Sequence, residues 1–204
     1  MRDPDSNLLY IINMPRRNHQ FAVDEYYHCY NRGTDKRVVF CDQQDYQYFI
    51  KSAESYNSTL ILGKLRLYDD NQSTERIVDI VSYCLLPNHY HFVLKERVEH
   101  GVSNFIHRLS LGYTMYFNNK YKRSGVLFQG PFKSKHIEDD QDLRQVIAYV
   151  NFNYKVHNIS DPTLYRSWLN NHLEIIRDPD SIYVDEDKMQ EIVDIIKLQR
   201  LSFD

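Results

Sequence analysis

Two histidines separated by one residue, His89 and His91, have types and spacing that suit metal chemistry. They lie in the segment PNHYHFVL at residues 87–94, where the proline and asparagine form a turn into a run typical of a strand. In a strand, residues i and i+2 project from one face, so the two imidazoles converge. Two neutral imidazoles side by side form half of a divalent-metal site.

The pair alone does not establish a metal site. With nine histidines in 204 residues, about 0.4 occurrences of His-x-His are expected by chance. Taken alone, the spacing is better explained by a pair of ordinary core or surface histidines. The metal interpretation therefore depends on further residues that can reach the same point.

A tyrosine and an asparagine on a predicted helix over residues 139–153 are candidates for that role. Tyr149 and Asn153 are spaced i, i+4, so they lie one turn apart at the edge of the apolar stripe of this helix. If the helix packs across the sheet, the amide oxygen of Asn153 can complete the metal shell while Tyr149 presents its hydroxyl to a metal-bound phosphate. Because the chain has 17 tyrosines, packing is the alternative role for Tyr149.

The rest of the chain supplies the elements that must position these side chains. Tyrosine-rich residues 25–32 end at Gly33 and read as a strand, and Asp42 can cap a helix that ends near residues 56–57. Further strands are predicted at residues 59–68, 77–86, 89–95 and 132–137, and a long amphipathic helix begins at Ser103. This order lacks regular alternation of strand and helix. It predicts an α+β fold, an antiparallel sheet with helices on one face.

Composition and charge set the domain organisation. We expect a flexible arm at residues 1–22, one domain at 23–160 and an acidic, largely helical extension at 161–204 with a helix from about residue 185 to 201. The three cysteines have no CxxC spacing and are expected to be reduced, and no apolar run is long enough for a bilayer. A soluble, cytoplasmic protein without a membrane partner is the prediction.

The net charge of −3 hides an uneven distribution. Residues 101–137 carry six basic and no acidic side chains, whereas residues 161–204 carry ten acidic and five basic ones. The basic segment can face phosphates, although a solvated surface is an equally good interpretation of charge alone.

Four motifs, taken in order, resemble the REP-associated tyrosine transposases within the single-tyrosine HUH, or insertion sequence 200-like, transposase family. They are YHCYNRG at residues 27–33, LPNHYHF at 86–92, GVLFQG at 125–130 and YVNFN at 149–153. The resemblance covers roughly residues 24–159. Two departures are Tyr154, where the family often has proline, and Phe132 after Gly130-Pro131, where Gly-Arg-Tyr is common.

The resemblance implies a ferredoxin-like or palm-like sheet and a role for each matching residue. His89 and His91 are the implied paired metal ligands, Asn153 the third ligand and Tyr149 the nucleophile. The implied activity is cleavage and rejoining of single-stranded or hairpin DNA through a 5′-phosphotyrosine, with Mg²⁺ or Mn²⁺ as cofactor, by a monomer or homodimer. Such an enzyme is a transposase.

The hypothesis of a DNA-cleaving enzyme also includes candidate DNA-binding residues, and two other functions compete with it. Arg32, Lys133 and Lys135 are candidate clamps on the DNA backbone, with solvated surface as the competing role. A phenol, with a pKa of about 10, leaves phosphorus more readily than an alkoxide, which suits a reversible step. Two alternatives stay open: a metal-dependent phosphodiesterase in which water attacks, and a non-catalytic nucleic-acid-binding module.

Overall fold

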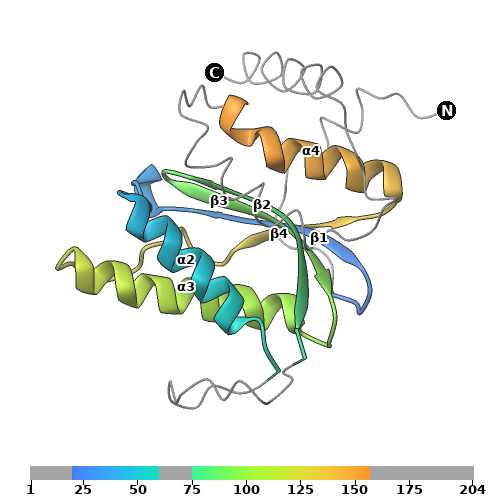
Figure 1. The fold of residues 1–204 in the computed structure, drawn as a ribbon, viewed down its shortest axis with the longest axis horizontal. Coiled ribbons are helices and arrows are strands. Elements are labelled where there is room, and N and C mark those ends of the chain that lie inside the picture. Colours follow the sequence, from blue (N-terminus) through green and yellow to red (C-terminus); the bar gives the residue numbers. More distant parts are fainter. Residues whose placement is uncertain (1–19, 60–74, 157–204) are drawn as a thin grey trace.

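A four-stranded antiparallel sheet forms the centre of the molecule (Figure 1). The computed structural model describes residues 20–59 and 75–156, and the strand order in the sheet is β2-β3-β1-β4. In chain order the elements are β1 (Tyr26–Arg32), the short 3₁₀ helix η1 (Thr34–Lys36), α2 (Gln43–Tyr56), β2 (Val78–Leu86), β3 (His89–Glu96), α3 (Gly101–Lys120), β4 (Lys133–Ile137) and α4 (Asp140–Val156). The α+β prediction with an antiparallel sheet is confirmed.

The helices cover both faces of the sheet, which corrects the prediction that they share one face. Helices α2 and α3 lie on one side and α4 on the other (Figure 1). The reason is visible in β3, where all but one of the eight side chains are buried. A strand buried on both faces needs a packed layer on each side, and alternating side chains feed two separate apolar clusters.

The predicted element boundaries agree closely with the structure. Asp42 caps α2 as expected, since its carboxylate accepts the Asp45 N–H at 3.0 Å. Helix α3 begins two residues before the predicted Ser103 because the buried Glu96 carboxylate, at the end of β3, accepts the Val102 N–H at 2.8 Å. A carboxylate from a neighbouring strand thus replaces a local cap. Burial raises the pKa of Glu96.

Several sequence predictions lie outside the described residues. They are the arm up to residue 19, the strand at 59–68 except its first residue, and the acidic extension at 161–204 with its helix. They stay predictions.

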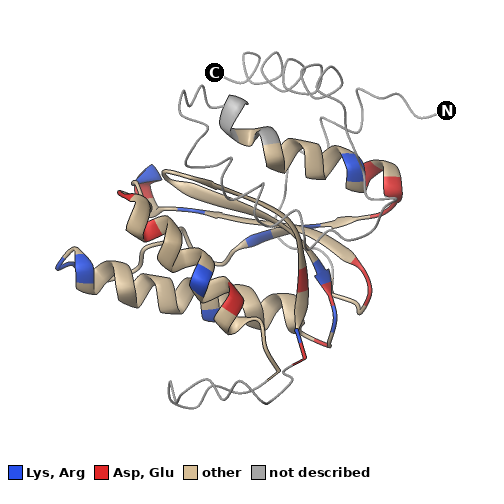
Figure 2. Ribbon diagram, viewed as in Figure 1, with Lys and Arg blue, Asp and Glu red and all other residues tan. Residues whose placement is uncertain are grey.

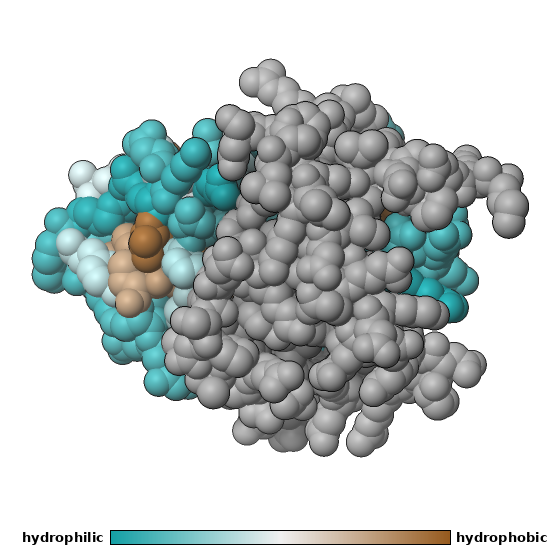
Figure 3. Space-filling view, turned by 90° about the horizontal axis from the view of Figure 1, so that it is seen from above, coloured by the Kyte–Doolittle hydropathy of each residue, from teal (hydrophilic) through white to brown (hydrophobic). Residues whose placement is uncertain are grey.

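On the face seen in Figure 3, the visible described residues are mostly hydrophilic and include one compact hydrophobic patch. Among the described helices, none is long and apolar enough to cross a membrane.

A buried carboxylate ties α2 to α3 on the face away from α4. Asp45 is fully buried and accepts hydrogen bonds from Lys120 Nζ at 2.7 Å, Tyr121 Oη at 2.8 Å and the Cys41 N–H at 2.8 Å. Its neighbour Asp42 also receives Lys120 Nζ at 2.8 Å. This network joins the start of one helix to the end of the other, so the two helices should behave as one layer.

Asp45→Ala should therefore destabilise the protein by about 3 kcal/mol, because it removes the buried carboxylate that accepts from Lys120, Tyr121, the Cys41 N–H and Tyr116 Oη. The control is Asp35→Asn, which removes an exposed ion pair with Arg37, keeps a residue type that tolerates the positive φ at this position and should change the unfolding free energy by about 0.5 kcal/mol or less. Chemical denaturation of both variants measures the difference. Equal effects of the two substitutions would contradict the structural role assigned to Asp45.

Candidate active site

The strand register gathers the predicted histidines and basic residues on one face of the sheet. Tyr30 of β1 lies opposite His91 of β3 on one side and opposite Lys133 of β4 on the other. Directly opposite residues of antiparallel strands share a face, so these three side chains form a row. The neighbouring rows on this face pair Arg32 with His89 and His28 with Lys135.

Helix α4 covers this face and brings Tyr149 to the histidines. The Tyr149 ring meets the His91 ring edge-on at a centroid distance of 5.6 Å and the His28 ring at 5.8 Å. The rings of His89 and His91 lie 5.1 Å apart, nearly perpendicular. The structure thus brings together three of the four residues predicted for the reaction centre, although they come from two elements nearly 60 positions apart.

The hydrogen bonds of His89 define its tautomer. Its Nδ1 lies 2.6 Å from Asn88 Oδ1, and the amide of Asn88 is oriented by donation from its Nδ2 to the Lys36 carbonyl at 3.2 Å. An amide oxygen only accepts, so His89 Nδ1 carries the proton and Nε2 keeps its lone pair. This is the state that a metal-binding imidazole requires.

A third histidine, His28, contacts His91 and was given no role by the sequence. Its Nε2 lies 2.9 Å from His91 Nδ1, and the side chain is only 1% exposed. Burial, with a smaller contribution from the charge of Lys135, lowers the pKa of His28 to about 3. The alternation of β1 places His28 on the face of Tyr30, but the contact with His91 depends on the pairing of β1 with β3, which the sequence does not give.

Asn153 lies one turn beyond Tyr149 and is completely buried. Neither its Oδ1 nor its Nδ2 has a hydrogen-bond partner among the described residues. Its place as third metal ligand beside His89 and His91 stays a prediction. Two residues before it, Asn151 accepts a hydrogen bond from Ser82 of β2 and anchors this part of α4 to the sheet.

The donor chemistry of these residues fits a divalent metal ion. A buried amide without a partner is costly unless something else satisfies it, and an amide oxygen with two imidazole nitrogens is a suitable ligand set. Within residues 20–59 and 75–156, no cluster of three or more His, Cys, Asp or Glu side chains can hold a metal. The predicted set therefore has only two histidines and relies on the Asn153 amide as its third member.

The basic side chains next to the histidines differ in exposure. Lys133 is exposed, and its ammonium lies 5.8 Å from the centroid of the Tyr30 ring. Lys135 is half-buried, and burial lowers its pKa to about 8, against the opposing charges of Asp142 and Glu138. Burial and the neighbouring Tyr149 raise the pKa of Tyr30 to about 12, so its hydroxyl keeps its proton.

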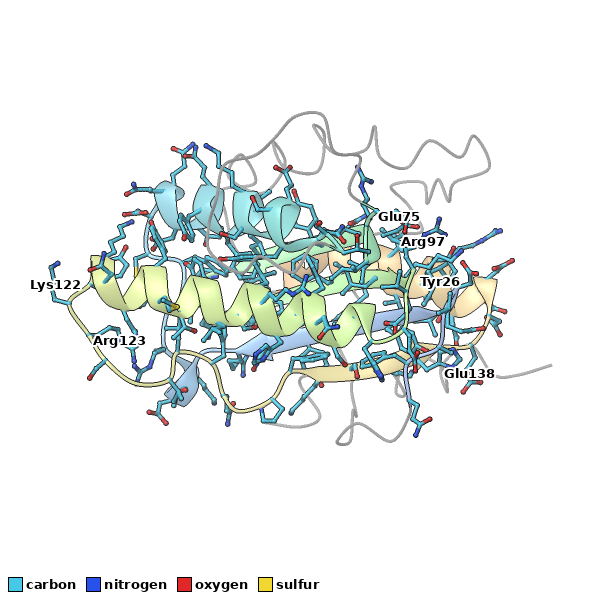
Figure 4. All side chains as sticks on the ribbon, turned by 90° about the horizontal axis from the view of Figure 1, so that it is seen from below. Tyr26, Glu75, Arg97, Lys122, Arg123 and Glu138 are labelled. Atoms are coloured by element: carbon cyan, nitrogen blue, oxygen red, sulfur yellow. The ribbon has the colours of Figure 1, made fainter. Side chains whose placement is uncertain are left out.

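The structure places the basic side chains of segment 101–137 in different surroundings. Three of its cations hold the fold: Arg108 donates to the Ser58 carbonyl, Arg123 to Asn118 and Val126, and Lys120 to the carboxylates described above. Lys133 and Lys135 instead lie on β4, in the rows of His91 and His28, and basic residues mark this strand in Figure 2. Lys122 and Arg123 lie at the opposite end of the molecule from Tyr26 and Glu138 (Figure 4). The six basic residues that give this segment its charge of +6 therefore do not form one continuous basic surface.

Acidic residues are scarce next to Tyr149. The acidic side chains of α4 are confined to its beginning, at Asp140 and Asp142 (Figure 2). The rest of the helix, which carries Tyr149 and Asn153, has no Asp or Glu. A polyanion can approach this part of the face without repulsion from α4.

Comparisons with known proteins show the family and the fold of the chain. The family model of IS200-like transposases matches residues 35–153, and the chain belongs to this family. A solved structure of a REP-associated tyrosine transposase bound to a REP hairpin superposes with a TM-score of 0.52, at 13% identity, over 84% of this chain and 89% of that one. This likeness concerns the fold.

A second solved structure, a protein from Deinococcus radiodurans that is described as a candidate transposase, gives a TM-score of 0.40 at 11% identity, over 67% of this chain and 95% of that one. Comparison with curated proteins finds no match.

The half-buried lysine at the site makes stability depend on pH. Because the pKa of Lys135 is lowered to about 8 in the folded protein, its ammonium destabilises the fold while it is charged, and the cost fades as pH rises towards the unfolded pKa of about 10.4. Lys135→Met should therefore raise the unfolding free energy at pH 7, with a smaller gain at pH 10. Lys133→Met, at an exposed position of the same strand, serves as the control and should show no such trend. Denaturation curves at both pH values test this, and a gain from Lys135→Met that is independent of pH would contradict it.

Proposed function

We propose that the protein is a metal-dependent transposase that cleaves and rejoins single-stranded DNA, with Tyr149 as the nucleophile. The observation that carries the proposal is the position of the Tyr149 ring, edge-on to His91 at 5.6 Å and beside the pair His89 and His91. Membership of the IS200-like transposase family supports it. Both alternatives from the sequence, a hydrolase and a binding module, remain outcomes of the tests below.

In the proposed reaction the phenol oxygen of Tyr149 attacks the scissile phosphate. The Tyr149 oxygen loses its proton and forms a bond to phosphorus, while the bond from phosphorus to the 3′ oxygen breaks and that oxygen takes up a proton. The products are a 5′-phosphotyrosine and a free 3′ hydroxyl. Reversal of the step with another 3′ hydroxyl rejoins DNA without loss of the phosphodiester energy, because a phenolate is a good leaving group.

The metal ligands would be His89, His91 and Asn153. A bound Mg²⁺ or Mn²⁺ supplies neutralisation of the charge that develops on the scissile phosphate. Three contacts support this arrangement: Asn88 fixes the His89 imidazole, the buried Asn153 amide has no hydrogen-bond partner among the described residues, and Ser82 anchors α4 through Asn151.

Arg32, Lys133 and Lys135 would hold the DNA backbone beside His89 and His91, on the side of β1 and β4. Arg32 shares a row of the sheet with His89, Lys133 with His91 and Lys135 with His28, so a DNA strand that places a phosphate at Tyr149 passes close to them. Each contact neutralises one phosphate and is weakened by salt. The structural likeness to a hairpin-bound transposase makes hairpin DNA our proposed substrate, cleaved by a monomer or homodimer.

His89→Ala and His91→Ala should each reduce cleavage of a labelled hairpin oligonucleotide below detection. Each removes one of three proposed ligands of the metal that stabilises the transition state. Binding of the same DNA in a mobility-shift assay should change by less than about threefold, because backbone contacts dominate nucleic-acid affinity. Asn153→Ala should lower the affinity for Mn²⁺, because it removes the third proposed ligand. Cleavage at wild-type rates by both histidine variants at low metal concentration would remove the metal site from the proposal.

Tyr149→Phe should retain the fold and metal binding but lose both strand cleavage and the covalent DNA adduct. Phe keeps the ring and its packing on His91 and His28, and loss of one half-buried hydroxyl costs only about 1 kcal/mol. The measurement is a denaturing gel of labelled hairpin DNA incubated with Mn²⁺, since a covalent adduct migrates with the protein.

The same gel separates the alternatives. A hydrolase in which water attacks would still nick DNA after Tyr149→Phe and would form no adduct with either protein. A binding module would shift DNA in a native gel and cleave with neither. An adduct that persists in Tyr149→Phe would show that another tyrosine attacks, and peptide mapping would identify it.

A further inference from the structure

We propose that His28 is a positioning residue that holds His91 in the tautomer able to bind the metal. This inference rests on the proposed function, because it concerns the same metal site. It assigns a role to a buried residue that touches a proposed ligand and neither the DNA nor the metal.

The contact between the two rings is close and sheltered. His28 Nε2 lies 2.9 Å from His91 Nδ1, and the rings stack at 5.1 Å with an angle of 20° between their planes. Both side chains are buried, His28 at 1% and His91 at 6% exposure. In such a place no bulk water competes for the hydrogen bond, so the identity of the donor decides the tautomers of both rings.

Metal binding selects one of the two possible arrangements. Two neutral imidazoles that share one hydrogen bond hold one proton between the facing nitrogens. If His91 Nδ1 donates to His28 Nε2, the lone pair on His91 Nε2 is available to a metal. If His28 donates instead, His91 carries its proton on Nε2 and cannot act as a ligand through that atom.

His28 must be neutral to accept this hydrogen bond, and its surroundings favour that state. It is buried, and the ammonium of Lys135 stands opposite it in the sheet. The rings of Tyr30 and Tyr149 also lie close to it, with centroid distances of 5.4 and 5.8 Å.

The two proposed histidine ligands, His89 and His91, are held by hydrogen-bond partners of different kinds. Asn88 Oδ1 can only accept, so His89 is fixed in the metal-binding tautomer before any metal arrives. His28 can donate or accept, and its second nitrogen, Nδ1, is buried with no hydrogen-bond partner among the described residues. In the proposed metal-bound state His28 Nε2 accepts from His91 Nδ1, and the proton of His28 then lies on Nδ1.

The test compares Mn²⁺ binding, followed by electron paramagnetic resonance, in the full chain and its variants. His28→Phe keeps a buried ring but removes the acceptor, and should weaken Mn²⁺ affinity by about tenfold or more. His28→Gln places an amide oxygen near the position of Nε2 and should retain most of the affinity. His136→Phe is the matched control, because His136 lies on the opposite face of the neighbouring strand β4 and pairs with Glu25.

A second measurement needs no substitution. Nitrogen NMR of the wild-type chain labelled at histidine, loaded with diamagnetic Mg²⁺, should show His91 protonated at Nδ1. Protonation at Nε2 would overturn the proposal. Equal Mn²⁺ affinity in His28→Phe, His136→Phe and wild type would overturn it as well.

His91→Ala separates this inference from the proposed function. If His91→Ala loses Mn²⁺ affinity while His28→Phe does not, the metal site stands and the role of His28 fails. If the wild type and His91→Ala bind Mn²⁺ equally, or neither binds, the metal site itself fails and the inference with it. Thermal unfolding of each metal-free variant verifies that lost affinity does not come from unfolding. If His28→Phe does not fold, the Mn²⁺ affinity of His28→Gln and the tautomer of His91 in the wild type decide the question.

Discussion

The register between β1 and β3 is the constraint on which the candidate active site depends. It places Tyr30 opposite His91 and Arg32 opposite His89, and it puts His28 within hydrogen-bonding distance of His91. A shift by one residue would reverse the faces of β1. Tyr27 and Cys29 would then face α4, and His28 would be buried in the other apolar cluster. The register is itself enforced by burial, because both faces of the sheet are covered and each side chain must match its own layer.

The two layers around the sheet have different functions. Helices α2 and α3 with the buried Asp45 form a scaffold that contains none of the proposed reaction residues. Helix α4 is held by a smaller apolar cluster and by the hydrogen bond between Ser82 and Asn151. It contributes Tyr149 and Asn153, so small movements of α4 would change the distance between the proposed nucleophile and the histidines. The proposed site thus lies between the sheet and one helix.

Local features of the site could be predicted from the sequence, and its assembly could not. The spacing of His89 and His91 gives a shared face from strand geometry alone, and the spacing of Tyr149 and Asn153 gives a shared side of a helix. The element bounds and the α+β class follow from apolar periodicity. The placement of α4 on its own face does not, because period and composition do not state which side of a sheet a helix covers. Nor could the contact between His28 and His91, since it joins residues 63 positions apart. The basic segment 101–137 divides into fold contacts and site residues only in three dimensions.

The central claim is that His89, His91 and Asn153 surround one metal position next to Tyr149. A crystal of the protein soaked in Mn²⁺ tests it most directly, through the anomalous scattering of the metal. The account predicts a single strong peak between Nε2 of both histidines and Oδ1 of Asn153, at about 2.0–2.3 Å from each ligand, as is usual for divalent ions with nitrogen and oxygen ligands. No peak at saturating Mn²⁺, or a peak that His89 and His91 do not contact, would contradict the account.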